Sequence, residues 1–119
     1  MSVSPETIVW QEAYSICGDD RDFLQEVLTD YVGEAEEAMK ALHDAIVAEN
    51  FAQVYQAAHK MKGNSAYLNC NAMKEICYSI QLASAETTIE KVPKLQHLYG
   101  IYCRCVDELK IEIQNHFSS

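Results

Sequence analysis

Glycine and proline are both scarce in this chain, which has 4 Gly and 2 Pro among its 119 residues. A β-sandwich or β-barrel needs many tight turns, which these two residues commonly supply, so the composition favours a few long helices. Basic residues are also few, with 9 Lys and Arg against 18 Asp and Glu and a net charge of −9. Nucleic acids and anionic membranes bind basic surfaces, so we expect neither as a partner.

No segment has the composition of a membrane span or an export signal. No apolar run approaches the roughly 18 residues that a span needs, and residues 1–6 lack the basic and apolar regions of a signal peptide. The five cysteines are odd in number and follow no Cys-x-x-Cys pattern, so we expect reduced and mostly buried thiols. These features predict a cytoplasmic protein, and a nuclear location is also compatible with them in a eukaryote.

Several catalytic motifs are missing as well. The sequence has no Gly-rich phosphate loop, so no ATP site or kinase activity is predicted, and no His-Glu-x-x-His motif, so we expect no metal or other cofactor. The hydrophobic share of 49% and the charged share of 23% are typical of a globular chain. We expect residues 1–119 to form a single domain, since that length suits one.

The spacing of apolar residues predicts five helices. The first opens at Ser4, with Pro5 as its first helical residue, and ends at Gly18. The second follows the pair Asp19-Asp20, either of which can cap it, and runs to about Ala48. Its apolar residues recur at helical spacing and are Leu24, Val27, Leu28, Tyr31, Ala35, Leu42, Ala45 and Ile46.

The third helix is predicted to start at Asn50, which forms a capping-box pattern with Gln53, and to end at Asn69. Asparagine is the second choice after glycine for the left-handed residue that ends a helix. The inward face of this helix is predicted to hold Phe51, Val54, Tyr55, Ala58, Met61, Ser65 and Leu68.

The fourth helix is predicted over residues 71–84, on Met73, Ile76, Cys77, Ile80 and Ala83. The fifth, with Pro93 in its first turn, alternates spacings of three and four through Val92, Leu95, Tyr99, Tyr102, Val106, Leu109 and Ile113. Short loops between such helices favour antiparallel neighbours. We therefore predict an all-α fold, an antiparallel up-down-up-down four-helix bundle with a short extra N-terminal helix. A monomer is expected, because the bundle uses the whole stripe of the fifth helix.

One stretch of the third helix has residues suited to chemistry. His59 lies about 120° from the centre of the inward stripe, at its solvent margin. Lys62, three residues on, can place its ammonium beside the imidazole. Gly63 costs roughly 1 kcal/mol relative to Ala in a helix, but its missing Cβ leaves room for another molecule to approach. An imidazole with a neighbouring cation and open space suits a nucleophile that receives an anionic group such as phosphoryl.

Simpler interpretations exist for both residues. An exposed histidine on a helix is usually a solvated side chain, and a mid-helix glycine can be a packing contact between helices. Composition and spacing therefore leave phosphoryl transfer as one interpretation among several.

Residues 57–68 read Ala-Ala-His-Lys-Met-Lys-Gly-Asn-Ser-Ala-Tyr-Leu. The pattern His-x-x-Lys-Gly, followed by small residues and then Leu, resembles the signature of the histidine-containing phosphotransfer (HPt) domains of two-component phosphorelays. The similarity continues in the acidic turn at residues 18–20, in the long second helix and in the Ile80-Gln81 pair of the fourth. It extends from about Ile8 to Phe117.

The resemblance implies a role for four residues. His59 would accept the phosphoryl group, Lys62 would be the cation near the phosphate, and Gly63 would provide clearance. Gln81 would donate a hydrogen bond to the imidazole or the phosphoryl group, with a plain surface glutamine as the alternative.

The sequence departs from the family pattern in two places beside this motif. Asn64 stands where the family usually has Ser or Ala, which puts the local contacts in doubt, and Asn69 stands where it usually has Gly. No basic residue follows Gln81 within one turn, where some relatives carry Arg.

The resemblance also places the first helix and the start of the second beside the acceptor. Ile16, Phe23 and Val27 could form an apolar patch there that docks a partner, ringed by three aspartates between residues 19 and 22. The alternative is that Phe23 and Val27 simply widen the buried face of a long helix.

The implied function is that of a phosphocarrier, which is not itself an enzyme. It would accept a phosphoryl group on His59 from the aspartate of one receiver (response-regulator) domain, which can belong to a hybrid sensor kinase, and pass it to another. The receiver would supply Mg²⁺ and the acidic pocket. Two alternatives stay open: an acidic interaction module without phosphotransfer, and a phosphatase acting through Gln81 or an acidic residue.

Overall fold

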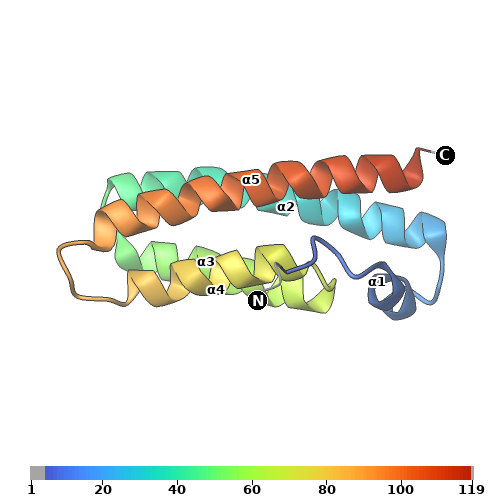
Figure 1. The fold of residues 1–119 in the computed structure, drawn as a ribbon, viewed down its shortest axis with the longest axis horizontal. Helices are drawn as coiled ribbons and strands as arrows, with labels where there is room; N and C mark the ends of the chain where they lie inside the picture. The colour runs from blue at the N-terminus through green and yellow to red at the C-terminus, as the bar shows by residue number, and fades with distance from the viewer. Residues whose placement is uncertain (1–4, 119) are drawn as a thin grey trace.

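The computed structural model describes residues 5–118, which form five α-helices and contain no strand (Figure 1). The helices are α1 (Trp10–Ile16), α2 (Arg21–Val47), α3 (Phe51–Tyr67), α4 (Asn71–Ser84) and α5 (Lys91–Phe117). The helix α2 packs against α3 and α5, and α4 packs against the same two, so four helices share one core. The all-α prediction is confirmed.

Local capping explains three of the helix boundaries. The Asp20 side chain accepts a hydrogen bond from the Phe23 N–H at 3.0 Å, and the Asn50 side chain accepts one from the Gln53 N–H at 3.3 Å, which satisfies free donors of the first turn. Asn69 has a φ of 60°, the left-handed conformation predicted for it. The starts of α2 and α3 and the end of α3 follow the sequence closely.

The predicted start of the first helix is wrong. Ser4 lies outside the described residues, Pro5 is not helical, and α1 begins only at Trp10. The segment before α1 instead pairs with the turn between α3 and α4. The Ala72 N–H donates to the Glu6 carbonyl at 2.9 Å, and the Val9 N–H donates to the Asn69 carbonyl at 3.0 Å. Since α4 has no side-chain cap, this segment supplies a carbonyl that its first turn needs.

The core contains most of the predicted apolar residues. Leu24, Leu42, Met73, Leu95 and Leu109 are completely buried, and they come from α2, α4 and α5. One member of the predicted α3 stripe is misplaced, because Tyr55 is 40% exposed. A phenol ring that lies at the margin of a helix stripe can keep its hydroxyl outside the core.

The cysteines are all free, and Cys17, Cys70 and Cys77 are buried while the other two are partly buried. Burial raises the pKa of the Cys70 and Cys77 thiols to about 12. These two thiols therefore stay protonated at neutral pH and behave as small apolar side chains.

The short helix α1 packs against the C-terminal end of α5. The Trp10 ring stacks on the His116 ring with centroids 3.7 Å apart, and its Nε1–H donates to Glu112 at 3.1 Å. The Tyr14 hydroxyl lies 2.8 Å from His116 Nε2. Burial, together with the nearby Arg21 charge, lowers the pKa of His116. These contacts fix α1 against the end of α5, and α1 also packs against α2.

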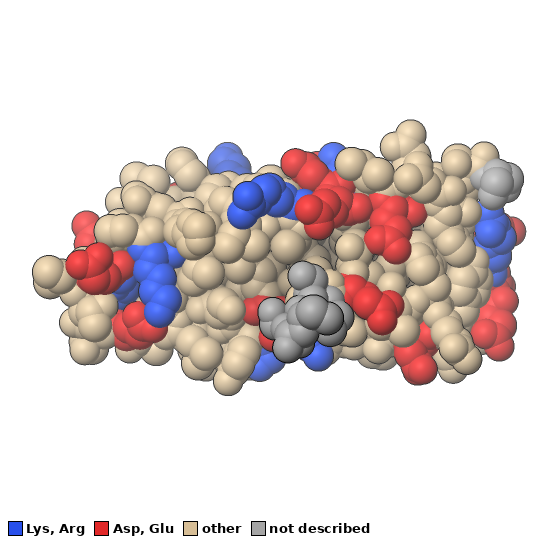
Figure 2. Space-filling model, viewed as in Figure 1, with Lys and Arg blue, Asp and Glu red and all other residues tan. Residues whose placement is uncertain are grey.

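The surface carries charges of both signs. Figure 2 shows acidic and basic side chains interspersed over one face of the molecule, with wide areas that carry neither. None of the helices within residues 5–118 is both long and apolar enough to cross a membrane.

Candidate functional site

His59 lies on the outer face of α3. Its side chain is exposed, whereas the neighbouring Ala58 and Met61 are 0% and 2% exposed. These two residues anchor the helix in the core, so its backbone presents the imidazole to solvent at the position that the apolar spacing predicts. A partner can therefore reach the ring without any opening of the fold.

The imidazole is flanked by an aromatic side chain that the sequence interpretation placed in the core. The rings of Tyr55 and His59 are nearly parallel, with an angle of 8° between them and centroids 6.0 Å apart. Such an offset, parallel pair is a favourable arrangement of aromatic rings. The sequence signal for this pair was its spacing, since residues four apart on a helix are neighbours.

Gln81 reaches this pair from α4. Its Nε2 donates a hydrogen bond to the Tyr55 hydroxyl at 2.9 Å, rather than to the imidazole. The side chain is only 9% exposed, so the alternative of a plain surface glutamine is wrong. The structure thus connects α4 to His59 through Tyr55.

Lys62 is also directed toward α4. Its Nζ lies 4.9 Å from the centroid of the Tyr78 ring, within the range of a cation–π interaction. The lysine is partly buried and lies one turn after His59 on the same helix. Tyr78 was not singled out from the sequence, because nothing local connects it to α3.

Gly63 faces open space. Apart from its chain neighbours and the backbone of its own helix, no heavy atom lies within 4 Å of the position that a Cβ would occupy there. The alternative interpretation, that this glycine is a packing contact between helices, is therefore wrong. The vacant surface is directly one helical turn beyond His59.

Asn64 contacts α2. Its Nδ2 donates to the Glu34 carboxylate at 2.9 Å. Beneath it, the Ser65 hydroxyl donates to the Met61 carbonyl at 2.6 Å and is also hydrogen-bonded to the Tyr31 hydroxyl. Asn64, which stands where the family usually has Ser or Ala, therefore contributes a contact between α2 and α3.

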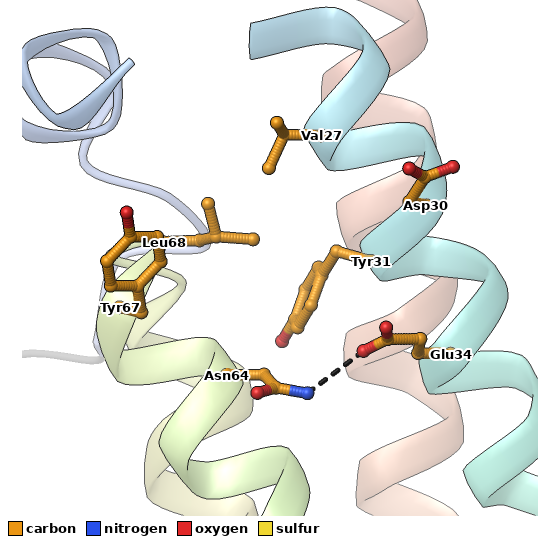
Figure 3. Close-up of a pocket in the computed structure, with 7 residues that line it drawn as sticks. All are labelled: Val27, Asp30, Tyr31, Glu34, Asn64, Tyr67 and Leu68. Atoms are coloured by element: carbon orange, nitrogen blue, oxygen red, sulfur yellow. Dashed lines mark hydrogen bonds between the residues drawn. The ribbon is translucent and has the colours of Figure 1, made fainter.

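A pocket of about 240 Å³ lies beside this contact, between α2 and α3 (Figure 3). Val27 and Leu68 line one end, while the hydrogen bond from Asn64 to Glu34 lies at the other. Its remaining lining residues are Asp30, Tyr31 and Tyr67. The pocket thus combines apolar walls with two carboxylates.

Two of the three predicted docking residues are exposed. Ile16 is 38% and Phe23 is 50% exposed, while Val27 is partly buried and packs against the core. Phe23 therefore does not widen the buried face of α2, although Val27 does. Phe23 lies one helical turn before Val27 on α2, so it adjoins the pocket that Val27 lines.

Comparison with known proteins identifies a matching family and two solved structures with a similar fold. A family model described as "Hpt domain" matches residues 26–115. The structure of histidine-containing phosphotransfer protein B (HptB) from Pseudomonas aeruginosa PAO1 is similar at a TM-score of 0.72 and 18% identity, covering 92% of this chain and 96% of that one. The HPT domain of the Hpt sensor hybrid histidine kinase from Shewanella is similar at a TM-score of 0.71 and 18% identity, covering 95% and 97%. Curated protein sequences give no match.

Proposed function

Because this chain belongs to the Hpt domain family and is a phosphocarrier of phosphorelays, we propose that it carries the phosphoryl group on His59. The observation that carries this assignment is the exposed imidazole on α3, with Lys62 one turn away and open space at Gly63. A nucleophile, a cation and access for a partner protein are the three features that the transfer requires.

In the proposed reaction, an unprotonated ring nitrogen of His59 attacks the phosphorus of a receiver's aspartyl phosphate. A P–N bond forms while the P–O bond to the aspartate breaks, and the carboxylate leaves with the bonding electron pair. The proton on the other ring nitrogen stays there. Onward transfer reverses these steps, with the aspartate of a second receiver as the nucleophile. The phosphoryl oxygens are negatively charged throughout, so a fixed cation beside the ring lowers the barrier.

Incubation of the protein with a phosphorylated receiver domain tests this proposal against its alternatives. A carrier acquires a stable phosphoryl label from the receiver. A phosphatase would release inorganic phosphate without becoming labelled, and an interaction module would bind the receiver and leave its phosphate in place.

Lys62 is proposed as the charge partner of the phosphoryl group, and Gln81, whose amide donates to the Tyr55 hydroxyl, as the second polar residue of the site. We expect Lys62→Ala to slow transfer roughly tenfold, which corresponds to about 1.4 kcal/mol of lost transition-state stabilisation. The Tm should change little, because a partly exposed charge contributes little to stability. Single-turnover transfer from a phosphorylated receiver measures the rate.

Lys60→Ala is the matched control for this experiment. Lys60 is an exposed lysine on the same helix, but it lies beside Glu34 and Glu37 in the groove toward α2. Its removal should leave the transfer rate within about twofold. Equal rates for Lys62→Ala and the unmodified protein would remove Lys62 from the site.

The scaffold behind the site is proposed to be an antiparallel up-down-up-down bundle that forms a single domain over residues 1–119. Contacts at both ends of α2 and α5 support this arrangement. Arg21 at the start of α2 donates to the His116 carbonyl near the end of α5 at 3.3 Å, whereas the ring of His43 near the end of α2 lies with its centroid 5.8 Å from that of Tyr99 in the first part of α5. Loops of a few residues join α2 to α3 and α3 to α4, which suits antiparallel neighbours.

Receiver domains are the proposed partners, and we place their docking surface over Ile16, Phe23 and Val27 and the adjoining pocket. Exposed apolar side chains with a charged surround are typical of protein–protein interfaces. A monomer in the cytoplasm is part of this proposal, since five free thiols suit a reducing compartment.

Phe23→Ala should separate docking from folding. Because the ring is half exposed, we expect a loss of less than about 2 kcal/mol of stability, compared with roughly 3–5 kcal/mol for a core phenylalanine. Affinity for the receiver should fall about tenfold, which is the effect of losing one aromatic contact residue. Thermal unfolding and titration calorimetry measure the two quantities.

Val47→Ala provides a comparison at the other end of α2, where the valine is 68% exposed. It should leave receiver affinity unchanged. A large drop in Tm for Phe23→Ala, with unchanged affinity in the folded fraction, would move the interface away from Phe23.

A further inference from the structure

The Tyr55 side chain contacts both His59 and Gln81. Its ring lies parallel to the imidazole, while its hydroxyl accepts the hydrogen bond from the buried Gln81 amide. The ring itself is 40% exposed, so it belongs to the surface around the acceptor and not to the core. A leucine or an alanine at this position would make neither contact.

The Gln81 side chain is the buried partner in this contact. It is 9% exposed and follows Ile80, which is completely buried on α4. The Gln81 Oε1 atom is buried and has no hydrogen-bond partner among residues 5–118, which is an unfavourable arrangement for an amide. An apolar residue would avoid that penalty but could not hold the Tyr55 hydroxyl. The described contact that uses the amide is the one to Tyr55.

The orientation of the imidazole matters for the transfer. An exposed histidine rotates about two side-chain torsions, whereas in-line attack requires one ring nitrogen to point along the P–O bond that breaks. The Tyr55 ring lies parallel to one face of the imidazole, and it thereby excludes many of the other orientations of the His59 ring. The Tyr55 ring can do so only if it is itself held, and the hydrogen bond from α4 holds it.

We propose that Tyr55 is a positioning residue for the phosphoryl acceptor, fixed by Gln81 and in turn orienting the His59 ring. This inference rests on the proposed function of His59. It also assigns to Gln81 an action through Tyr55 in place of a direct bond to the acceptor ring.

Transfer kinetics with a phosphorylated receiver test this role in three variants. Tyr55→Ala removes ring and hydroxyl, and we expect the maximal rate to fall about two- to tenfold, the range that an aromatic pair provides. The receiver concentration at half-maximal rate should stay unchanged. Tyr55→Phe and Gln81→Leu each break the same hydrogen bond, so each should give the same smaller loss, and the double variant should lose no more than either one.

A measurement without any receiver tests the geometry independently. The Tyr55 ring current should shift the NMR signals of the His59 ring protons away from their values in a free histidine. That shift should disappear in Tyr55→Ala and become smaller in Tyr55→Phe, whose ring remains but is no longer held by the hydrogen bond from Gln81. Tyr99→Phe, which removes a hydroxyl on α5, should change neither the spectrum of His59 nor the transfer rate. Because this signal does not depend on phosphoryl transfer, it separates this inference from the proposed function.

Two results would overturn the inference. One is a Tyr55→Ala variant with an unchanged maximal rate and a raised half-maximal receiver concentration, which would make Tyr55 a docking contact. The other is an additive loss in the double variant of Tyr55→Phe and Gln81→Leu, which would show that Gln81 acts on the acceptor or the phosphoryl group directly.

Discussion

Replacement of His59 by glutamine should abolish phosphoryl transfer to the protein. Glutamine is polar and of similar length, but its amide nitrogen has no available lone pair with which to attack phosphorus. Loss of the nucleophile in a covalent mechanism removes the reaction path itself, so we expect the rate to fall by more than about a thousandfold. His59 is exposed, and its replacement should therefore leave the Tm almost unchanged.

Transfer of label from a phosphorylated receiver, followed by acid and base treatment, measures this result. A phosphohistidine is a phosphoramidate, which is labile in acid and stable in base, whereas a phosphoserine has the opposite behaviour. His43→Gln is the matched control, because His43 is an exposed histidine on α2. The control should accept label like the unmodified protein. Acceptance of base-stable label by the His59→Gln variant would show that another residue carries the group.

The helices could be predicted from the sequence because their signals are local. The strict three-four alternation on α5 and the side-chain caps at Asp20 and Asn50 require only residues within one or two turns. The predicted start of the first helix is wrong for the opposite reason. Ser4-Pro5 is a good local start signal, but the backbone of Glu6 and Val9 pairs with the turn between α3 and α4, a contact that no local pattern contains.

In the candidate site, too, some residues can be identified from local spacing and others cannot. His59, Lys62 and Gly63 lie within one helical turn of each other and could be identified by spacing. Their neighbours come from α4: Tyr78 contacts Lys62, and Gln81 donates a hydrogen bond to Tyr55, which lies beside His59. Their effect depends on how two helices pack, which the sequence of either helix does not specify. The spacing of Tyr55 places it at the edge of the inward stripe, which suits a buried ring and an exposed ring equally well.

The second large expected effect concerns the vacant surface at Gly63. A larger side chain there should block docking of the receiver without any loss of stability. A glutamine at residue 63 would extend toward the N-terminal side of its own Cα, over the turn that contains His59. We expect Gly63→Gln to reduce transfer from a receiver by about a hundredfold or more, since a misplacement of about 1 Å in a reacting complex already costs that much. The Tm should stay the same or rise, because glycine in a helix is less stable than other residues by up to about 1 kcal/mol and the new Cβ would meet no atom beyond the local backbone of α3 within 4 Å.

A small phosphoryl donor separates this steric effect from damage to the nucleophile. Phosphoramidate needs no protein interface, so it should label His59 in the Gly63→Gln variant at nearly the rate of the unmodified protein. Gly100→Gln is the control, because Gly100 is an exposed glycine on α5 that also faces open space; it should leave both reactions unchanged. Gly63→Ala should raise the Tm and impair receiver transfer far less, since a single methyl group barely extends over the imidazole. If Gly63→Gln accepts phosphoryl from a receiver as fast as the unmodified protein, the partner does not approach His59 over this turn of α3.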